Sequence, residues 1–121
     1  MKVIAVDDLP GDPLAAAAVF HQHWLPFAEE ILASGEDLLL VFAPADHAHG
    51  GWRRAAVAAL ARKHAPRRVN AVASPGSASL AAAQRYLAEA PGVTGQYLPL
   101  APPGEAGGGD GGGQRAPDGA G

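Results

Sequence analysis

Apolar residues along the chain fall into short continuous runs that alternate with longer segments of helical periodicity. Three runs, at residues 3–6, 38–42 and 69–73, have the length and composition of buried strands, and a weaker one covers residues 95–98. Unbroken apolar runs are typical of parallel strands that are covered on both faces. These four segments predict the strands of one parallel sheet.

The intervening segments, 13–33, 51–64 and 77–88, repeat apolar residues at the spacing of a helix. Asp12 can act as the N-cap of the first, with Pro13 at the first helical position. Pro26 removes one internal hydrogen bond, so we expect an irregularity after Trp24. The order βαβαβαβ predicts a three-layer α/β domain with right-handed crossovers.

The predicted domain covers residues 1–100, and residues 101–121 have a different composition. This last segment holds nine of the sixteen glycines and no large apolar side chain. Such a sequence buries too little apolar surface to offset its backbone entropy. We therefore expect a disordered Gly/Pro-rich tail.

Composition and charge also indicate where the protein is located and which classes of partner are expected. The chain has no cysteine, no signal-peptide pattern and no apolar run of membrane-spanning length. We therefore expect a cytoplasmic protein with no membrane partner. Charge is uneven, with eight acids and one base in residues 1–50 but six bases and no acid in residues 51–70. An acidic chain without interleaved aromatics argues against nucleic acid and favours a basic face that meets acidic surface in the same or a neighbouring subunit.

Three stretches resemble the C-terminal half of a short-chain dehydrogenase/reductase. They are "WLPFAEEILASGEDLLLVFAPA", "LARKHAPRRVNAVASPG" and "YLAEAPGVTGQYLPL", in the family's order and spacing over roughly residues 20–100. The small size is also similar to that of uncharacterised proteobacterial "short-chain dehydrogenase-like" proteins. The resemblance implies a half Rossmann-like fold in a truncated domain.

The chemical motifs of that family are missing. The turn "VDDLPGDPLA" has one glycine, and its aspartates stand where a dinucleotide phosphate would need donors. By the resemblance, the catalytic serine position falls near Ala43 and Pro44, the tyrosine position near Asp46 and the lysine position near Gly50. No tyrosine precedes Tyr86. We therefore predict no catalytic residue, no cofactor-binding residue and no cofactor.

The loop that holds Asp46, His47 and His49 is the remaining candidate for chemistry. A His-x-His pair beside a carboxylate can chelate a metal ion, although zinc sites usually need three or four protein ligands. His21 and His23 point apart on a helix, and His64 lies in another segment. The alternative is that Asp46 caps the helix near Gly50 and the histidines are solvated. We predict no metal site, and we expect Ser77 and Ser79 to be helix caps rather than nucleophiles.

These observations favour a non-catalytic domain that acts through protein contacts. A ligand- or metal-binding protein, or a hydrolase-type enzyme that uses the Asp46/His47/His49 loop, is the alternative. We expect a homodimer through the helices at 13–33 and 51–64, as in the family it resembles. The supporting apolar stripes are Phe20, Trp24, Phe27 and Ile31, and Trp52, Ala56, Ala59 and Lys63. Alternatively, the same stripes pack on the sheet of their own subunit, a role that Val19, Leu25 and Leu32 could also fill.

Overall fold

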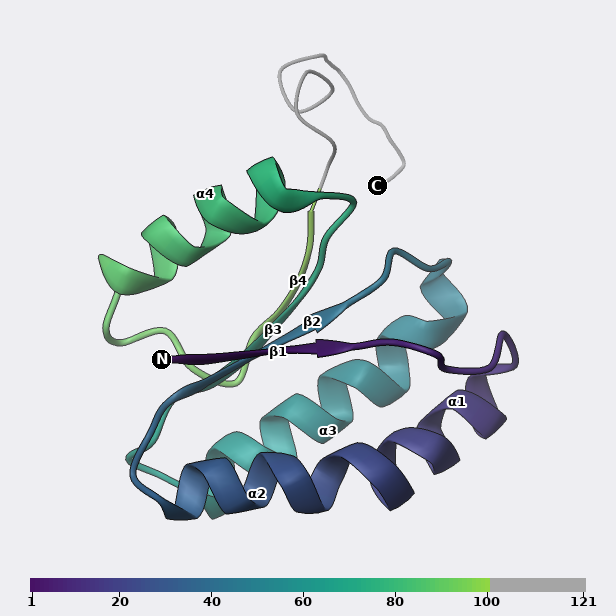
Figure 1. The fold of residues 1–121 in the computed structure, drawn as a ribbon, viewed down its shortest axis with the longest axis horizontal. Coiled ribbons are helices and arrows are strands. Elements are labelled where there is room, and N and C mark those ends of the chain that lie inside the picture. Colours follow the sequence, from purple (N-terminus) through teal and green to yellow (C-terminus); the bar gives the residue numbers. More distant parts are fainter. Residues whose placement is uncertain (101–121) are drawn as a thin grey trace.

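Four parallel strands form the centre of the structure, a computed structural model that describes residues 1–100 (Figure 1). They are β1 (Lys2–Val6), β2 (Leu38–Phe42), β3 (Val69–Ala73) and β4 (Tyr97–Pro99), and their order in the sheet is β1-β2-β3-β4. β2 and β3 coincide with the predicted strands, and the predicted α/β class is confirmed. The predicted disordered tail lies outside the described residues.

The prediction for the fourth strand was wrong by two residues at its start. Gly95 has a positive φ of 75°, and its N–H donates to the Val69 carbonyl over 2.7 Å. This left-handed turn, which favours glycine, brings the chain alongside β3 before regular pairing starts. Pairing begins at Ala71 with Tyr97, so Gly95 belongs to the turn and not to the strand.

The first helical segment is divided into three parts, α1 (Pro13–Val19), the π-helical η1 (Phe20–Trp24) and α2 (Leu25–Ala33). Asp12 is the N-cap, as predicted, and its Oδ2 accepts a hydrogen bond from the Ala15 N–H over 2.9 Å. The irregularity that Pro26 predicted is the π turn, in which the Leu25 N–H donates to the Phe20 carbonyl. A wider turn of this kind accommodates proline, which has no backbone N–H to donate.

The remaining helices are η2 (His47–His49), α3 (Gly50–Lys63) and α4 (Ser77–Ala88). The N-cap of α4 is neither Ser77 nor Ser79, the two positions that the sequence suggested. Gly76 is the N-cap and makes no side-chain capping hydrogen bond, while Ser77 is already the first helical residue. Glycine is accepted at this position although serine is preferred, so the serines alone did not locate the cap.

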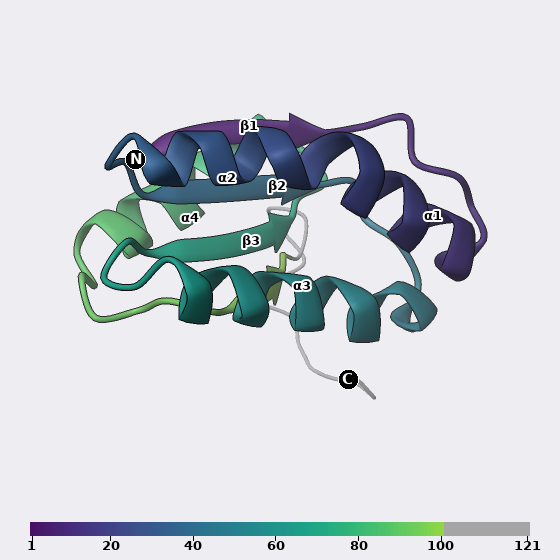
Figure 2. The same ribbon diagram turned by 90° about the horizontal axis from the view of Figure 1, so that it is seen from below.

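Helices cover both faces of the sheet, as a three-layer fold requires. Figures 1 and 2 show α1, α2 and α3 on one face and α4 on the other. The sheet continues in one direction from β1 to β4, so the crossover through α4 has the opposite hand from the first two. The prediction of right-handed crossovers throughout was wrong for this last one. With all helices on one face, Leu39 and Val72 would lie uncovered, whereas α4 now buries both.

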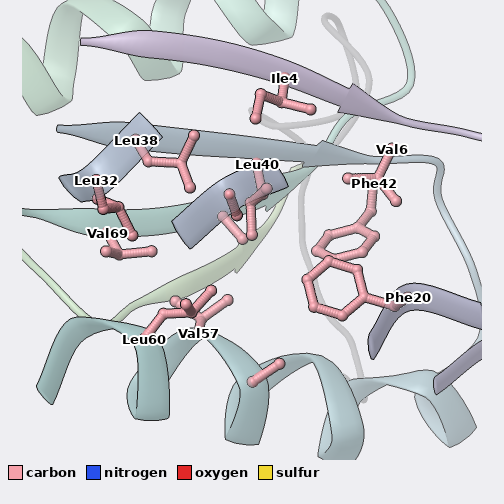
Figure 3. Packing of buried hydrophobic residues seen from close by; sticks show 13 residues of the cluster. Ile4, Val6, Phe20, Leu32, Leu38, Leu40, Phe42, Val57, Leu60 and Val69 are labelled. Carbon is pink, nitrogen blue, oxygen red and sulfur yellow. The ribbon is translucent and has the colours of Figure 1, made fainter. Parts of the chain in front are cut away.

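The larger core lies between the sheet and α1, α2 and α3 (Figure 3). Side chains of β2 on this face meet Phe20 from η1 and Val57 and Leu60 from α3. The rings of Phe20 and Phe42 lie 5.8 Å apart between centroids. Burial of side chains of this size contributes about 1.5–3 kcal/mol each, which makes this layer the main source of stability.

The acidic first half and the basic second half of the sequence meet within this one chain. Lys63 Nζ lies 2.6 Å from the Glu29 carboxylate, and Arg68 Nε lies 3.3 Å from that of Asp37. Arg68 also donates to the carbonyls of Leu87 and Ala90 at the end of α4, each over 3.1 Å. The basic segment is therefore distributed over separate intramolecular contacts. Among residues 1–100, no helix has both the length and the apolar character that crossing a membrane requires.

Candidate functional site

A cavity of about 260 Å³ lies at the carboxyl ends of β1 and β2. It is enclosed by the loop that follows β1 and the loop that follows β2. Open α/β sheets bind ligands at this end of their strands, which makes the cavity the first candidate for a site. The residues that line it are Val6, Asp7, Asp8, Leu9, Pro10, Gly11, Ala43, Pro44, Ala45, His49 and Arg53.

Arg53, from the first turn of α3, is the buried cation of this cavity, with 4% of its surface exposed. Its Nη1 donates to the Ala43 carbonyl over 3.0 Å and to the Tyr97 hydroxyl over 2.9 Å. The guanidinium carbon lies 4.5 Å from the centroid of the Phe42 ring. Its Nε is buried and has no hydrogen-bond partner. Within residues 1–100, Arg53 forms no ion pair with a carboxylate.

His49 connects the two loops that enclose the cavity. Its Nε2 lies 3.0 Å from the Gly11 carbonyl, and its Nδ1 accepts a hydrogen bond from the Trp52 indole N–H over 3.2 Å. Because the indole can only donate, Nδ1 carries no proton, and Nε2 is the donor to Gly11. The expectation that both histidines are solvated was wrong for His49, which is 8% exposed, because this pair of partners draws the ring inward.

The rest of the Asp46/His47/His49 loop is arranged as a helix start. Asp46 Oδ1 accepts a hydrogen bond from the Ala48 N–H over 3.1 Å and caps η2, which leads directly into α3 at Gly50. His47 is exposed. Both ring nitrogens of His49 already have partners, so this ring offers no lone pair to a metal ion without breaking the network.

The other histidines serve separate positions. His21 Nδ1 lies 2.7 Å from the Ala17 carbonyl on its own helix, and His64 Nε2 lies 2.8 Å from the Glu29 carboxylate. His23 is exposed and lines an open hollow of about 330 Å³ with Trp24 and Phe27. Within residues 1–100, no group of three or more histidine and acidic side chains is arranged to hold a metal ion.

The positions at which the resemblance places catalytic groups either line the cavity or are next in sequence to a residue that lines it. Ala43 and Pro44 line it, Asp46 caps η2, and Gly50 is buried at the start of α3. Of these, only Asp46 has a side chain that could transfer a proton, and its carboxylate is engaged with the Ala48 N–H.

A second feature is an apolar groove between the helices of the large layer, which we call the α2–α3 groove. It has a volume of about 190 Å³ and is lined by His21, Leu25, Glu29, Ala56, Ala59, Leu60 and Lys63. Hydrogen bonds from Lys63 and then from His64 lower the pKa of the Glu29 carboxyl. Glu29 is therefore charged at neutral pH and pairs with Lys63 across the groove.

The two predicted interface stripes pack largely within their own subunit. Phe20 is fully buried, Ala56 is 6% exposed, and Trp24, Ile31 and Trp52 are half-buried against the core. Only Phe27, Ala59 and Lys63 remain exposed. Because a π turn intervenes, the helical spacing used to define the first stripe does not hold through Trp24. Most of these side chains therefore contact the core of their own subunit, and an interface through the same helices stays a prediction.

Sequence reasoning missed Arg53, although its pattern contains a signal for it. Arg53, Ala56, Val57 and Leu60 lie at i, i+3, i+4 and i+7, and all four are buried. A basic residue in register with the core-facing positions of a helix is a candidate for a buried cation. Its place in a run of six bases hides this signal, because most of the other bases of residues 51–70 are on the surface.

Comparison with known proteins gives one finding on the family. A family model described as short chain dehydrogenase-like protein matches residues 4–100. No curated protein and no solved structure matches the chain.

Proposed function

The chain belongs to the short chain dehydrogenase-like family, and from this premise we propose that it is a non-catalytic member that acts through protein contacts, beginning with self-association. The chemical part of this proposal is supported by the residues at the family's catalytic positions. Ala43, Pro44 and Gly50 have no side chain that can donate or accept a proton. A cytosolic location stays a prediction that the lack of cysteine favours.

The observation that supports self-association is the α2–α3 groove. Leu25 and Ala59 leave apolar surface on opposite sides of it, and Ala59 is small enough for another helix to approach closely. A two-fold axis that passes near the groove would place the same helices of a second copy over it. The charged pair of Glu29 and Lys63 at its edge would then lie at the polar rim of the interface.

The oligomeric state tests this proposal directly. Sedimentation velocity at tens of micromolar should give the mass of two chains. Ala59→Glu should give one chain, because the longer charged side chain would occupy the space that the helix of the second copy needs and would place a second carboxylate beside Glu29. Ala82→Glu on α4 is the matched control, since Ala82 is also exposed but lies on the other face of the sheet. A wild-type mass of one chain across the range, or equal effects of the two variants, would contradict self-association through this groove.

The non-catalytic part needs its own test. Melting curves with NAD or NADP at millimolar concentration should match those without it, because a ligand that binds the folded state raises stability by RT ln(1 + [L]/Kd). A rise of several degrees that saturates with dinucleotide would overturn this part and leave the self-association result standing.

A further inference from the structure

The cavity at the ends of β1 and β2 contains a positively charged side chain, Arg53, that makes no ion pair within residues 1–100. Arg68 and Lys63 each pair with a carboxylate, whereas Arg53 donates only to two neutral oxygens. Its burial removes the solvent that would otherwise stabilise the charge, and its Nε lacks any acceptor. Buried charges in proteins are ordinarily paired, so an unpaired one in a cavity indicates a missing anion.

The size and walls of the cavity limit what that anion can be. A volume of about 260 Å³ lies just below the range of pockets for drug-sized ligands, so a molecule of metabolite size fits. Val6, Leu9 and Ala45 provide apolar wall that suits a short carbon chain. The guanidinium plane matches a carboxylate, which can accept two parallel hydrogen bonds from it.

Two aspartates that line the same cavity further limit which ligand can bind. Asp7 and Asp8 are exposed carboxylates that would repel a doubly charged anion such as phosphate. They can instead accept hydrogen bonds from a hydroxyl or an ammonium group. Asp8 has a φ of 58°, in the left-handed region that aspartate adopts more readily than most residues other than glycine.

We propose that this cavity binds a small monocarboxylic acid with an α-hydroxyl or α-amino group. The carboxylate pairs with Arg53, and the hydroxyl or ammonium faces Asp7 and Asp8. His49, through its bonds to Gly11 and Trp52, holds the two enclosing loops together. The site is independent of the proposed self-association, which uses the α2–α3 groove.

Calorimetric titration and melting curves with the intact protein test the ligand class. The probes are sodium lactate, alanine, sodium acetate and inorganic phosphate, with sodium chloride used to keep the ionic strength constant. Lactate or alanine should bind saturably and about fivefold more tightly than acetate, the effect of one added hydrogen bond. Phosphate should bind more weakly than either. No saturable binding of lactate or alanine, or tighter binding of phosphate, would overturn the proposal.

Variants locate the site. Arg53→Gln should weaken lactate or alanine binding at least tenfold, the usual effect of losing a charged hydrogen-bond pair. Ala45→Leu, which fills the cavity and keeps Arg53, should weaken it equally. Arg62→Gln removes the same charge from an exposed position on the same helix and should change affinity by less than twofold. If Arg53→Gln does not fold, Ala45→Leu decides, and wild-type affinity in that variant would refute the location.

Discussion

Replacing Arg53 by methionine should leave the free energy of unfolding of the ligand-free protein almost unchanged. Methionine keeps an unbranched apolar stem and removes the guanidinium, the part of Arg53 that lies over the Phe42 ring. For a residue that is 4% exposed and hydrogen-bonded twice, a neutral outcome is not what burial alone suggests. We expect it because the cost of burying the charge and the Nε without an acceptor offsets the favourable contacts of the guanidinium.

The magnitude can be worked out from the contacts. The substitution loses two hydrogen bonds from a charged donor, about 1.5 kcal/mol each, and a desolvated cation–π contact of about 2 kcal/mol. The substitution also removes two costs, which are the desolvation penalty of a buried ion, about 4 kcal/mol, and the unsatisfied Nε, about 1 kcal/mol. The two sides are each about 5 kcal/mol, so the expected change lies within about 1 kcal/mol of zero.

Urea unfolding followed by circular dichroism, without added carboxylic acid, measures this change. The midpoint for Arg53→Met should lie close to that of the wild type, with the same slope. Addition of lactate or alanine should then stabilise the wild type alone, because the ligand supplies the missing anion to Arg53. A loss of more than about 2 kcal/mol in the free protein would refute the reasoning and make Arg53 a structural residue.

Two further predictions concern Asp37 and Arg68. Arg68→Met should lower the free energy of unfolding by about 3 kcal/mol in urea titrations, because it removes the hydrogen bonds to Asp37, Leu87 and Ala90 together. The control Arg67→Met removes one exposed hydrogen bond to Gly35 and should lower it by less than about 1 kcal/mol. Equal losses would contradict this assignment. Burial raises the pKa of Asp37, but hydrogen bonds from the Arg68 backbone and side chain outweigh burial and lower it. The Asp37 carboxylate therefore contributes fully to the free energy of unfolding above its pKa in the unfolded chain, and this contribution is lost as the pH falls through its pKa in the folded protein. The difference in stability between wild type and Asp37→Asn should be large at pH 7 and shrink towards pH 3. A difference that does not change with pH would show that the carboxylate charge is not involved.

The fold followed from the sequence because local and global signals agree in its most regular parts. β2 and β3 are buried on both faces, so their apolar runs have no competing interpretation. The last crossover did not follow, because its side of the sheet depends on which apolar face remains uncovered after the first two helices have packed. That is a property of the assembled sheet, which no local pattern contains.

The candidate site could be predicted only in part. The sheet end and its loop were evident from Pro44 and Asp46, which directly follow β2. The inward turn of His49 depends on Gly11, 38 positions away in the sequence, and on the Trp52 indole. Arg53 likewise needs Tyr97 from the opposite end of the domain. Contacts over such separations arise from tertiary packing, which the local pattern does not specify.

The contrast between the buried Arg53 and the partly exposed Arg68 is the reason to connect Arg53 with function. Arg68 ties β2, β3 and the end of α4 together through a carboxylate and several carbonyls, so the fold itself accounts for it. The fold does not explain Arg53 in the same way, because we expect its favourable contacts only to offset the cost of burying its charge. The small contribution to stability that we expect of Arg53, together with its unpaired charge beside a cavity at the strand ends, supports the proposal that it binds a ligand. The proposed lack of the family's catalytic groups and the proposed ligand site are compatible, since they concern different residues of the same sheet end.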